Sequence, residues 1–103
     1  MDNKISINTK EIPYQDRYKL LIGSIVPRPI GFISTIDKNG TYNLAPFSFF
    51  MGVCSNPMTV LFCPVIRSSD GHEKDTLKNI RETKEFLVNI VSEEIVLQNM
   101  HLE

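Results

Sequence analysis

The tetrapeptide DKNG at residues 37–40 is the feature that most restricts the fold of this 103-residue chain. Asn39-Gly40 accepts the positive φ angles of a tight hairpin turn, and apolar segments lie on both sides. The preceding segment, residues 30–36, is β-branched and aromatic, and the returning strand is expected over residues 41–45. Pro46 has no N–H to give to a strand ladder, so we expect an edge, a bulge or a strand end there.

The remaining elements follow from apolar periodicity. Helices are predicted over residues 14–23, 74–84 and 92–100, and further strands over residues 58–66 and 85–91. Asp75 or Thr76 can cap the second helix, in which Leu77 and Ile80 are the apolar positions. The strand over residues 58–66 is apolar on both faces and is therefore expected to be interior. The pattern predicts a mostly antiparallel sheet with helices at its margins, closed as a small barrel.

Composition restricts the class of function. A net charge of −1, with 42% hydrophobic and 22% charged residues, is typical of one soluble domain over residues 1–103. The mixed charges give no indication of nucleic-acid or membrane binding, and the apolar runs are too short to cross a bilayer. No secretory signal is evident, so we expect a cytoplasmic protein. A chain of this size has a modest core, which oligomerisation would help to stabilise.

The sequence predicts no metal centre. Cys54 and Cys63 lack metal-ligand spacing and lie in apolar runs, so we expect reduced, packed thiols. His72 and His101 are isolated in the sequence.

Two cations are candidate anion ligands. Arg28 stands between Pro27 and Pro29, and an arginine fork pairs well with phosphate or carboxylate; alternatively it is a surface arginine on a stiff loop. Lys74 precedes a helix whose first residues are Asp75 and Thr76, a phosphate cradle of N–H groups, helix dipole and one cation. The alternative is an ordinary helix cap with a solvated lysine.

The segment NLAPFSFFMGVCSNP, residues 43–57, is apolar but interrupted by proline, glycine and polar residues. A flat aromatic ligand needs irregular backbone at its edge and a few polar groups facing its heteroatoms. Asn43 and Ser48 could supply such groups. The alternative is that Phe47, Phe49 and Phe50 are core or dimer-interface residues, and for Phe47 and Phe49 this is the better explanation.

Together these segments resemble a known family. IVPRPIGFISTIDKNGTYNLAPFSFFMGVCSNP followed by KDTLKNIRETKEFLVNIV is similar to the flavin reductase-like proteins with an FMN-binding split β-barrel, flavoredoxin among them, from about Leu20 to Val91. The resemblance implies a Greek-key antiparallel split barrel, a homodimer or higher homo-oligomer, and noncovalent FMN near the subunit interface. It also implies NAD(P)H as an electron donor for some members.

The resemblance implies a set of cofactor-binding residues and no catalytic acid or base. Around the phosphate and ribityl chain it places Arg28, Lys74, Asp75 and Thr76. Beside the flavin it places Ser34 and Thr35. Against the isoalloxazine ring it places Asn43, Ala45, Pro46, Ser48, Phe49 and Phe50. Asn89 also matches the family, and it either contacts the ligand or bonds to a neighbouring backbone.

The chain stops where family members continue with further strands. We therefore expect the N-terminal part of the family's domain, with Leu102 and Glu103 resembling an expression-vector remnant. An incomplete barrel exposes apolar edges, so we do not expect a monomer.

Three functions compete. The first is an FMN-dependent oxidoreductase that passes electrons from NAD(P)H to an acceptor. The second is an FMN-binding electron carrier without its own NAD(P)H site. The third is a truncated, non-catalytic domain that only self-associates.

Overall fold

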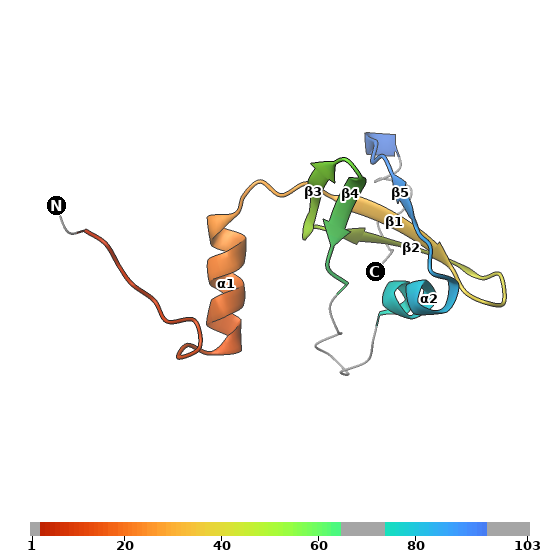
Figure 1. The fold of residues 1–103 in the computed structure, drawn as a ribbon. Coiled ribbons are helices and arrows are strands. Elements are labelled where there is room, and N and C mark those ends of the chain that lie inside the picture. The colour runs from red at the N-terminus through yellow and green to blue at the C-terminus, as the bar shows by residue number, and fades with distance from the viewer. Residues whose placement is uncertain (1–2, 65–73, 95–103) are drawn as a thin grey trace.

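A computed structural model describes residues 3–64 and 74–94 of the chain (Figure 1). The elements in order are α1 (Tyr14–Ser24), β1 (Gly31–Ile36), β2 (Tyr42–Phe47), β3 (Phe50–Ser55), β4 (Met58–Phe62), α2 (Asp75–Thr83) and β5 (Leu87–Asn89). They form a three-stranded sheet of order β2-β1-β5 and a two-stranded sheet of β3 and β4. All described strand pairs are antiparallel. The expected class, mostly β with flanking helices, is confirmed.

The β1–β2 hairpin forms where the DKNG turn predicts it. Gly40 has φ +86°, a conformation that favours glycine. The Asp37 carboxylate accepts hydrogen bonds from the backbone N–H groups of Asn39 and Thr41, at 2.8 and 2.9 Å. β2 continues through Pro46, beyond the predicted end, and Pro46 lies on an edge strand of the described sheet. The expectation for this proline is therefore confirmed.

Side chains of β1 alternate between two faces of the sheet. Ile33 and Thr35 point to the inner face, where Ile33 packs with Ala45 and Phe47 in the core. The ring of Phe62 lies between those of Phe47 and Phe86, with centroids 5.2 and 5.0 Å away. This row of rings joins the two sheets, because Phe47 lies on β2 in one sheet and Phe62 on β4 in the other. Phe86 directly precedes β5 of the first sheet.

Helix α2 lies against β1 and β2 and begins one residue later than predicted (Figure 1). Its N-cap position is Lys74, so the expectation that Asp75 or Thr76 caps it is wrong. Thr76 is instead enclosed, with 0% of its surface exposed. The helix ends at Thr83, and its C-cap residue, Lys84, has φ 64° and donates its N–H to the Ile80 carbonyl.

The β3–β4 hairpin differs most from expectation. β4 ends at Phe62 and pairs only with β3 among the described strands, with Met58 88% exposed. Over the described residues 58–64 the prediction of an interior strand is therefore wrong, and the last two residues of the predicted range, 65 and 66, lie outside the described residues. β3 is irregular, with a register shift between Gly52 and Cys54. The expected interruption of the 43–57 segment thus appears as a bend between β2 and β3 and a bulge within β3.

The structure also differs from expectation in the burial of the two cysteines and in the length of β5. Cys54 and Cys63 are free thiols as predicted, but both are exposed rather than packed. β5 is shorter than the predicted strand over residues 85–91. Most of the predicted helix over residues 92–100, both histidines and the final two residues lie outside the described residues.

The N-terminal segment and α1 lie beside the sheets (Figure 1). α1 forms where predicted, yet none of its residues is buried. Its Tyr18 ring forms a T-shaped pair with the Phe49 ring, with centroids 6.3 Å apart and an interplanar angle of 81°. The radius of gyration is 16.7 Å, whereas a compact chain of this length would have about 13 Å. No helix in the described ranges is long and apolar enough to cross a membrane.

Candidate functional site

A groove of about 380 Å³ lies between α1 and the β3–β4 hairpin. This volume falls in the range of roughly 300–1,000 Å³ for small-molecule sites. Its lining residues are Leu21, Ile25, Arg28, Pro29, Ser48, Phe49, Phe50, Met51, Leu61 and Cys63. The structure therefore brings together Arg28, Ser48, Phe49 and Phe50 of the predicted set. An apolar groove with one cation suits a ligand with an apolar body and an anionic group.

Arg28 lies over the face of an aromatic ring in this groove. Its guanidinium carbon is 5.0 Å from the centroid of the Phe49 ring, within the range of a cation–π interaction. Pro27 and Pro29 restrict the backbone on both sides. Within residues 3–64 and 74–94, no carboxylate forms an ion pair with Arg28. The ring orients the positive charge without neutralising it.

Lys74 has a similar arrangement at the mouth of α2. Its Nζ lies 5.2 Å from the centroid of the Phe47 ring. Phe47 and Phe49 are separated only by Ser48, so both predicted cations lie against one bend of the chain. Arg28 lines the groove, whereas Lys74 is not among its lining residues.

Three other predicted residues are bonded within the protein. The Asn43 amide donates to the Thr76 hydroxyl at 2.9 Å, and the Asn79 amide donates to the Thr35 hydroxyl at 3.0 Å. The sequence predicts Leu77 and Ile80 as the packing positions of the helix and gives no such indication for Asn79. The buried residues of α2 are instead Thr76 and Asn79, whose i, i+3 spacing was the available signal.

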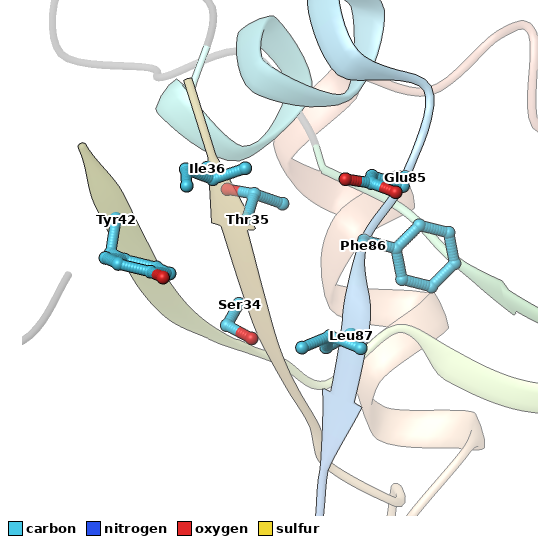
Figure 2. Close-up of a pocket in the computed structure, with 7 residues that line it drawn as sticks. All are labelled: Ser34, Thr35, Ile36, Tyr42, Glu85, Phe86 and Leu87. Carbon is cyan, nitrogen blue, oxygen red and sulfur yellow. The ribbon is translucent and has the colours of Figure 1, made fainter. Parts of the chain in front are cut away.

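A second cavity, of about 180 Å³, is lined by residues of β1, β2 and the segment that leads into β5 (Figure 2). Ser34 lines it, and the Ser34 hydroxyl accepts a hydrogen bond from the Asn89 amide at 3.1 Å. The same amide group donates to the backbone carbonyl of Phe32 at 3.0 Å. The backbone contact expected as one possibility for Asn89 is therefore formed. In Figure 2 the Phe86 ring points away from the other labelled side chains.

Ser34 and Thr35, two of the predicted ligand residues, are neighbours on β1. Both line the cavity of Figure 2, but their hydroxyl groups have different partners: that of Thr35 bonds to Asn79 on α2, and that of Ser34 to Asn89 on β5. This fits the alternation of side chains along a strand. Of the remaining predicted residues, Ala45 is buried in the core and Pro46 is exposed. Asp75 lines a polar cavity of about 180 Å³ together with Asp37, Thr41, Tyr42, Asn43, Lys78 and Asn79. The structure thus distributes the predicted residues among the groove, the core contact with α2 and two smaller cavities.

Comparison with known proteins places this arrangement in a family. The sequence model of the flavin reductase like domain matches residues 22–101. The chain belongs to this family. An uncharacterized protein of Aquifex aeolicus is 52% identical over 86 residues, covering 84% of this chain and 43% of the relative. The uncharacterized protein YwrF of Bacillus subtilis is 40% identical, covering 84% of this chain and 41% of the relative.

Solved structures of two family-like proteins share the fold. Nitrilotriacetate monooxygenase component B from Bacillus cereus has a TM-score of 0.78 and 39% identity, covering 94% of this chain and 47% of that one. The 2-nitrobenzoate 2-nitroreductase NbaA of Pseudomonas fluorescens has a TM-score of 0.72 and 30% identity, covering 93% and 45%. The flavin reductase-like fold is therefore confirmed. The chain spans less than half the length of these relatives.

Proposed function

We propose that this flavin reductase-like chain binds FMN noncovalently and acts as an oxidoreductase, passing electrons from NAD(P)H to an acceptor. The observation that carries the proposal is Arg28, held over the Phe49 ring at the edge of an apolar groove. Apolar walls suit the flavin ring, and a guanidinium that has no described carboxylate partner suits its phosphate. The residues of the groove thus fit FMN in their chemical character.

Each group has a distinct role in this proposal. Arg28 binds the phosphate, while Phe49 and Phe50 exclude water from one wall of the site. Ser48 offers a hydroxyl on the same wall. Bound FMN would supply the redox chemistry, so no side chain of this chain is assigned as an acid–base catalyst.

Flavin titration followed by anaerobic reduction tests the proposal. We expect the purified protein to quench FMN fluorescence at a stoichiometric end point, and NADH or NADPH to bleach the bound flavin in stopped flow. Absence of FMN binding would contradict the proposed function. Binding without reduction by either nucleotide would instead support an electron carrier.

We also propose that the chain is a homodimer or higher oligomer in the cytoplasm. The chain exposes 8466 Å², whereas a compact monomer of this mass would expose roughly 5,900 Å². Exposed apolar side chains on the hairpin, such as Val53 at 53% and Met58 at 88%, account for part of the difference. The free, exposed thiols of Cys54 and Cys63 suit a reducing compartment.

A further inference from the structure

Helix α1 forms one wall of the groove that holds Arg28. Leu21 and Ile25 line the groove from this side, and the bend before β3 and the β3–β4 hairpin line it from the other. Tyr18, Leu21 and the C-cap residue Ile25 are spaced three and four residues apart, which places them on one side of the helix. The side of α1 that faces the groove is therefore aromatic and aliphatic.

The packing of this wall within the chain is slight. No residue of α1 is buried, and Leu21 and Ile25 remain 45% and 55% exposed although they line the groove. The N-cap residue, Pro13, provides no side-chain capping hydrogen bond. A helix of 11 residues is marginal in water by itself, because most helical stability in proteins comes from the packing of an apolar face. Within the part of the chain that the structure describes, α1 thus lacks the packing that would hold it firmly.

A ring contact links α1 to the positive charge of the groove. Tyr18 and Phe49 form a T-shaped pair with centroids 6.3 Å apart. The guanidinium carbon of Arg28 lies 5.0 Å from the centroid of the same Phe49 ring. One aromatic pair is a weak attachment for a helix. Phe49 therefore connects the helical wall with the cation but does not fix the wall in place.

The groove indicates what could complete the packing of α1. Its volume of about 380 Å³ lies between α1 and the hairpin, so a molecule that fills it contacts both walls. Arg28 adds a positive charge to a mainly apolar lining, and an apolar polypeptide surface would bury that charge without a partner. A flat aromatic molecule with an anionic group suits both walls and the guanidinium.

We propose that α1 is a ligand-ordered wall of this groove: Leu21 and Ile25 pack on the aromatic body of the ligand and close the groove over it. The ligand class is a flat aromatic compound with an anionic group, so the inference rests on the proposed binding of FMN. The empty groove leaves α1 loosely attached, whereas the filled groove supplies the packing that the helix lacks. Binding of the ligand and ordering of α1 are therefore coupled.

Hydrogen exchange of the α1 amides tests this coupling. In the free chain, the amides of residues 18–24 should exchange faster than those of β1, which carries the core residue Ile33. FMN at about ten times its Kd should slow their exchange roughly fivefold or more. The amides of residues 3–12, which precede α1 and line no part of the groove, should not change. If the α1 amides of the free chain already exchange as slowly as those of β1, the wall is fixed and the inference is wrong.

Leu21→Ala and Leu20→Ala form a matched pair, because both remove the same atoms from the same helix and alanine is a strong helix former. Leu20, 39% exposed, is not among the groove residues, whereas Leu21 is. We expect Leu21→Ala to weaken binding of FMN and of riboflavin, which lacks the phosphate, equally and by about three- to tenfold. Leu20→Ala should change neither affinity. Equal effects of the two variants, or a loss limited to FMN, would contradict the contact of Leu21 with the aromatic body.

This inference and the proposed function can fail separately. Binding of FMN with unchanged exchange in α1 would overturn the inference and leave the proposed function intact. Exchange in α1 that slows with protein concentration and not with FMN would assign the wall to a second copy of the chain, which also overturns it. If the unmodified chain binds neither flavin, the proposed function itself fails, and the inference fails with it.

Discussion

Phe47 and Phe49 each lie against a cation, and only Ser48 separates them in the chain. Lys74 Nζ is 5.2 Å from the first ring centroid, and the guanidinium carbon of Arg28 is 5.0 Å from the second. The two cations come from segments more than forty residues apart in the sequence. Each of the two rings beside the bend between β2 and β3 thus carries one of the cations that the sequence motifs suggested, although only Arg28 lines the groove.

Replacement of Arg28 should weaken binding of the phosphate group selectively. We expect Arg28→Ala to reduce FMN affinity roughly 10- to 100-fold and riboflavin affinity much less. Arg28→Lys should recover only part of the loss, because an ammonium lacks the bidentate fork. The measurement is fluorescence titration with both flavins. Arg17→Ala, on exposed α1, is the matched control, and equal losses for both flavins in Arg28→Ala would refute the assignment.

Lys74→Ala should show the same selectivity with a smaller effect, about three- to thirtyfold on FMN, because an ammonium makes weaker, single contacts to phosphate. Lys78→Ala, one turn further along α2, should leave both affinities unchanged. Calorimetric titration at two salt concentrations would check the ionic origin of the difference. If Lys78→Ala matched Lys74→Ala, a general effect of helix charge would be the explanation instead.

Gly31 permits the Phe50 ring to lie against the start of β1. A Cβ placed at Gly31 would stand 2.5 Å from Cδ1 and 2.8 Å from Cγ of that ring. We expect Gly31→Ala to lower the free energy of unfolding by about 1–3 kcal/mol through overpacking, as measured by urea denaturation. Gly23→Ala, where nothing lies within 4 Å and the residue is helical, should not lower it and should raise it by up to about 1 kcal/mol. Equal effects would show that Phe50 moves aside without cost.

The hairpin turn should depend on acid pH. The backbone N–H of Thr41 is the main cause that lowers the pKa of Asp37, assisted by the N–H groups of Asn39 and Gly40 and the charge of Lys78, while desolvation opposes it. Because the folded-state pKa lies below the unfolded-state value, the stabilisation is present above the unfolded-state pKa. It is lost as pH falls through the folded-state pKa.

Amide NMR across the acid range checks this prediction. The Thr41 amide signal should shift and its exchange protection should fall together with the titration of Asp37. In Asp37→Ala the Thr41 signal should show no such transition. A transition that persists in this variant would assign the acid effect to another group.

Self-association should depend on the β3–β4 hairpin. We expect sedimentation equilibrium at micromolar concentration to give a mass above that of one chain. Val53→Lys, a charge on an exposed apolar strand, should weaken the association. Ile5→Lys, at a side chain 86% exposed in the N-terminal segment, is the control. A stable, folded monomer of the unmodified chain would count against the proposal.

The β1–β2 turn and α1 could be predicted from the sequence, because the structure of each depends on residues that are close together in the chain. Asn39-Gly40 marks a turn through its backbone preferences, and the apolar positions of residues 14–23 mark α1. The burial of β4 could not be predicted, because an apolar strand looks the same whether its own chain or another surface covers it. Sequence patterns report what a side chain prefers and not what is available to cover it.

The interface between α2 and the sheet shows a second limit. Asp75 and Thr76 have the composition of a helix cap, and a local pattern cannot show that Thr76 is used by Asn43, which is distant in sequence. Burial of Asn79 likewise depends on Thr35 across the interface. For the candidate site, the structure brings Arg28, Ser48, Phe49 and Phe50 of the predicted set to one groove, but the motifs could not separate Ser34 from Thr35. That separation depends on which face of β1 each residue occupies.

The hydrogen bond from Asn89 to Ser34 has a consequence for the polarity of the cavity in Figure 2. The Ser34 oxygen accepts from this amide and keeps a second lone pair, while its hydroxyl hydrogen can rotate toward another acceptor. The cavity wall can therefore meet either a donor or an acceptor at this point. Asn89 thus holds in place a hydroxyl whose own polarity adapts to the group that faces it.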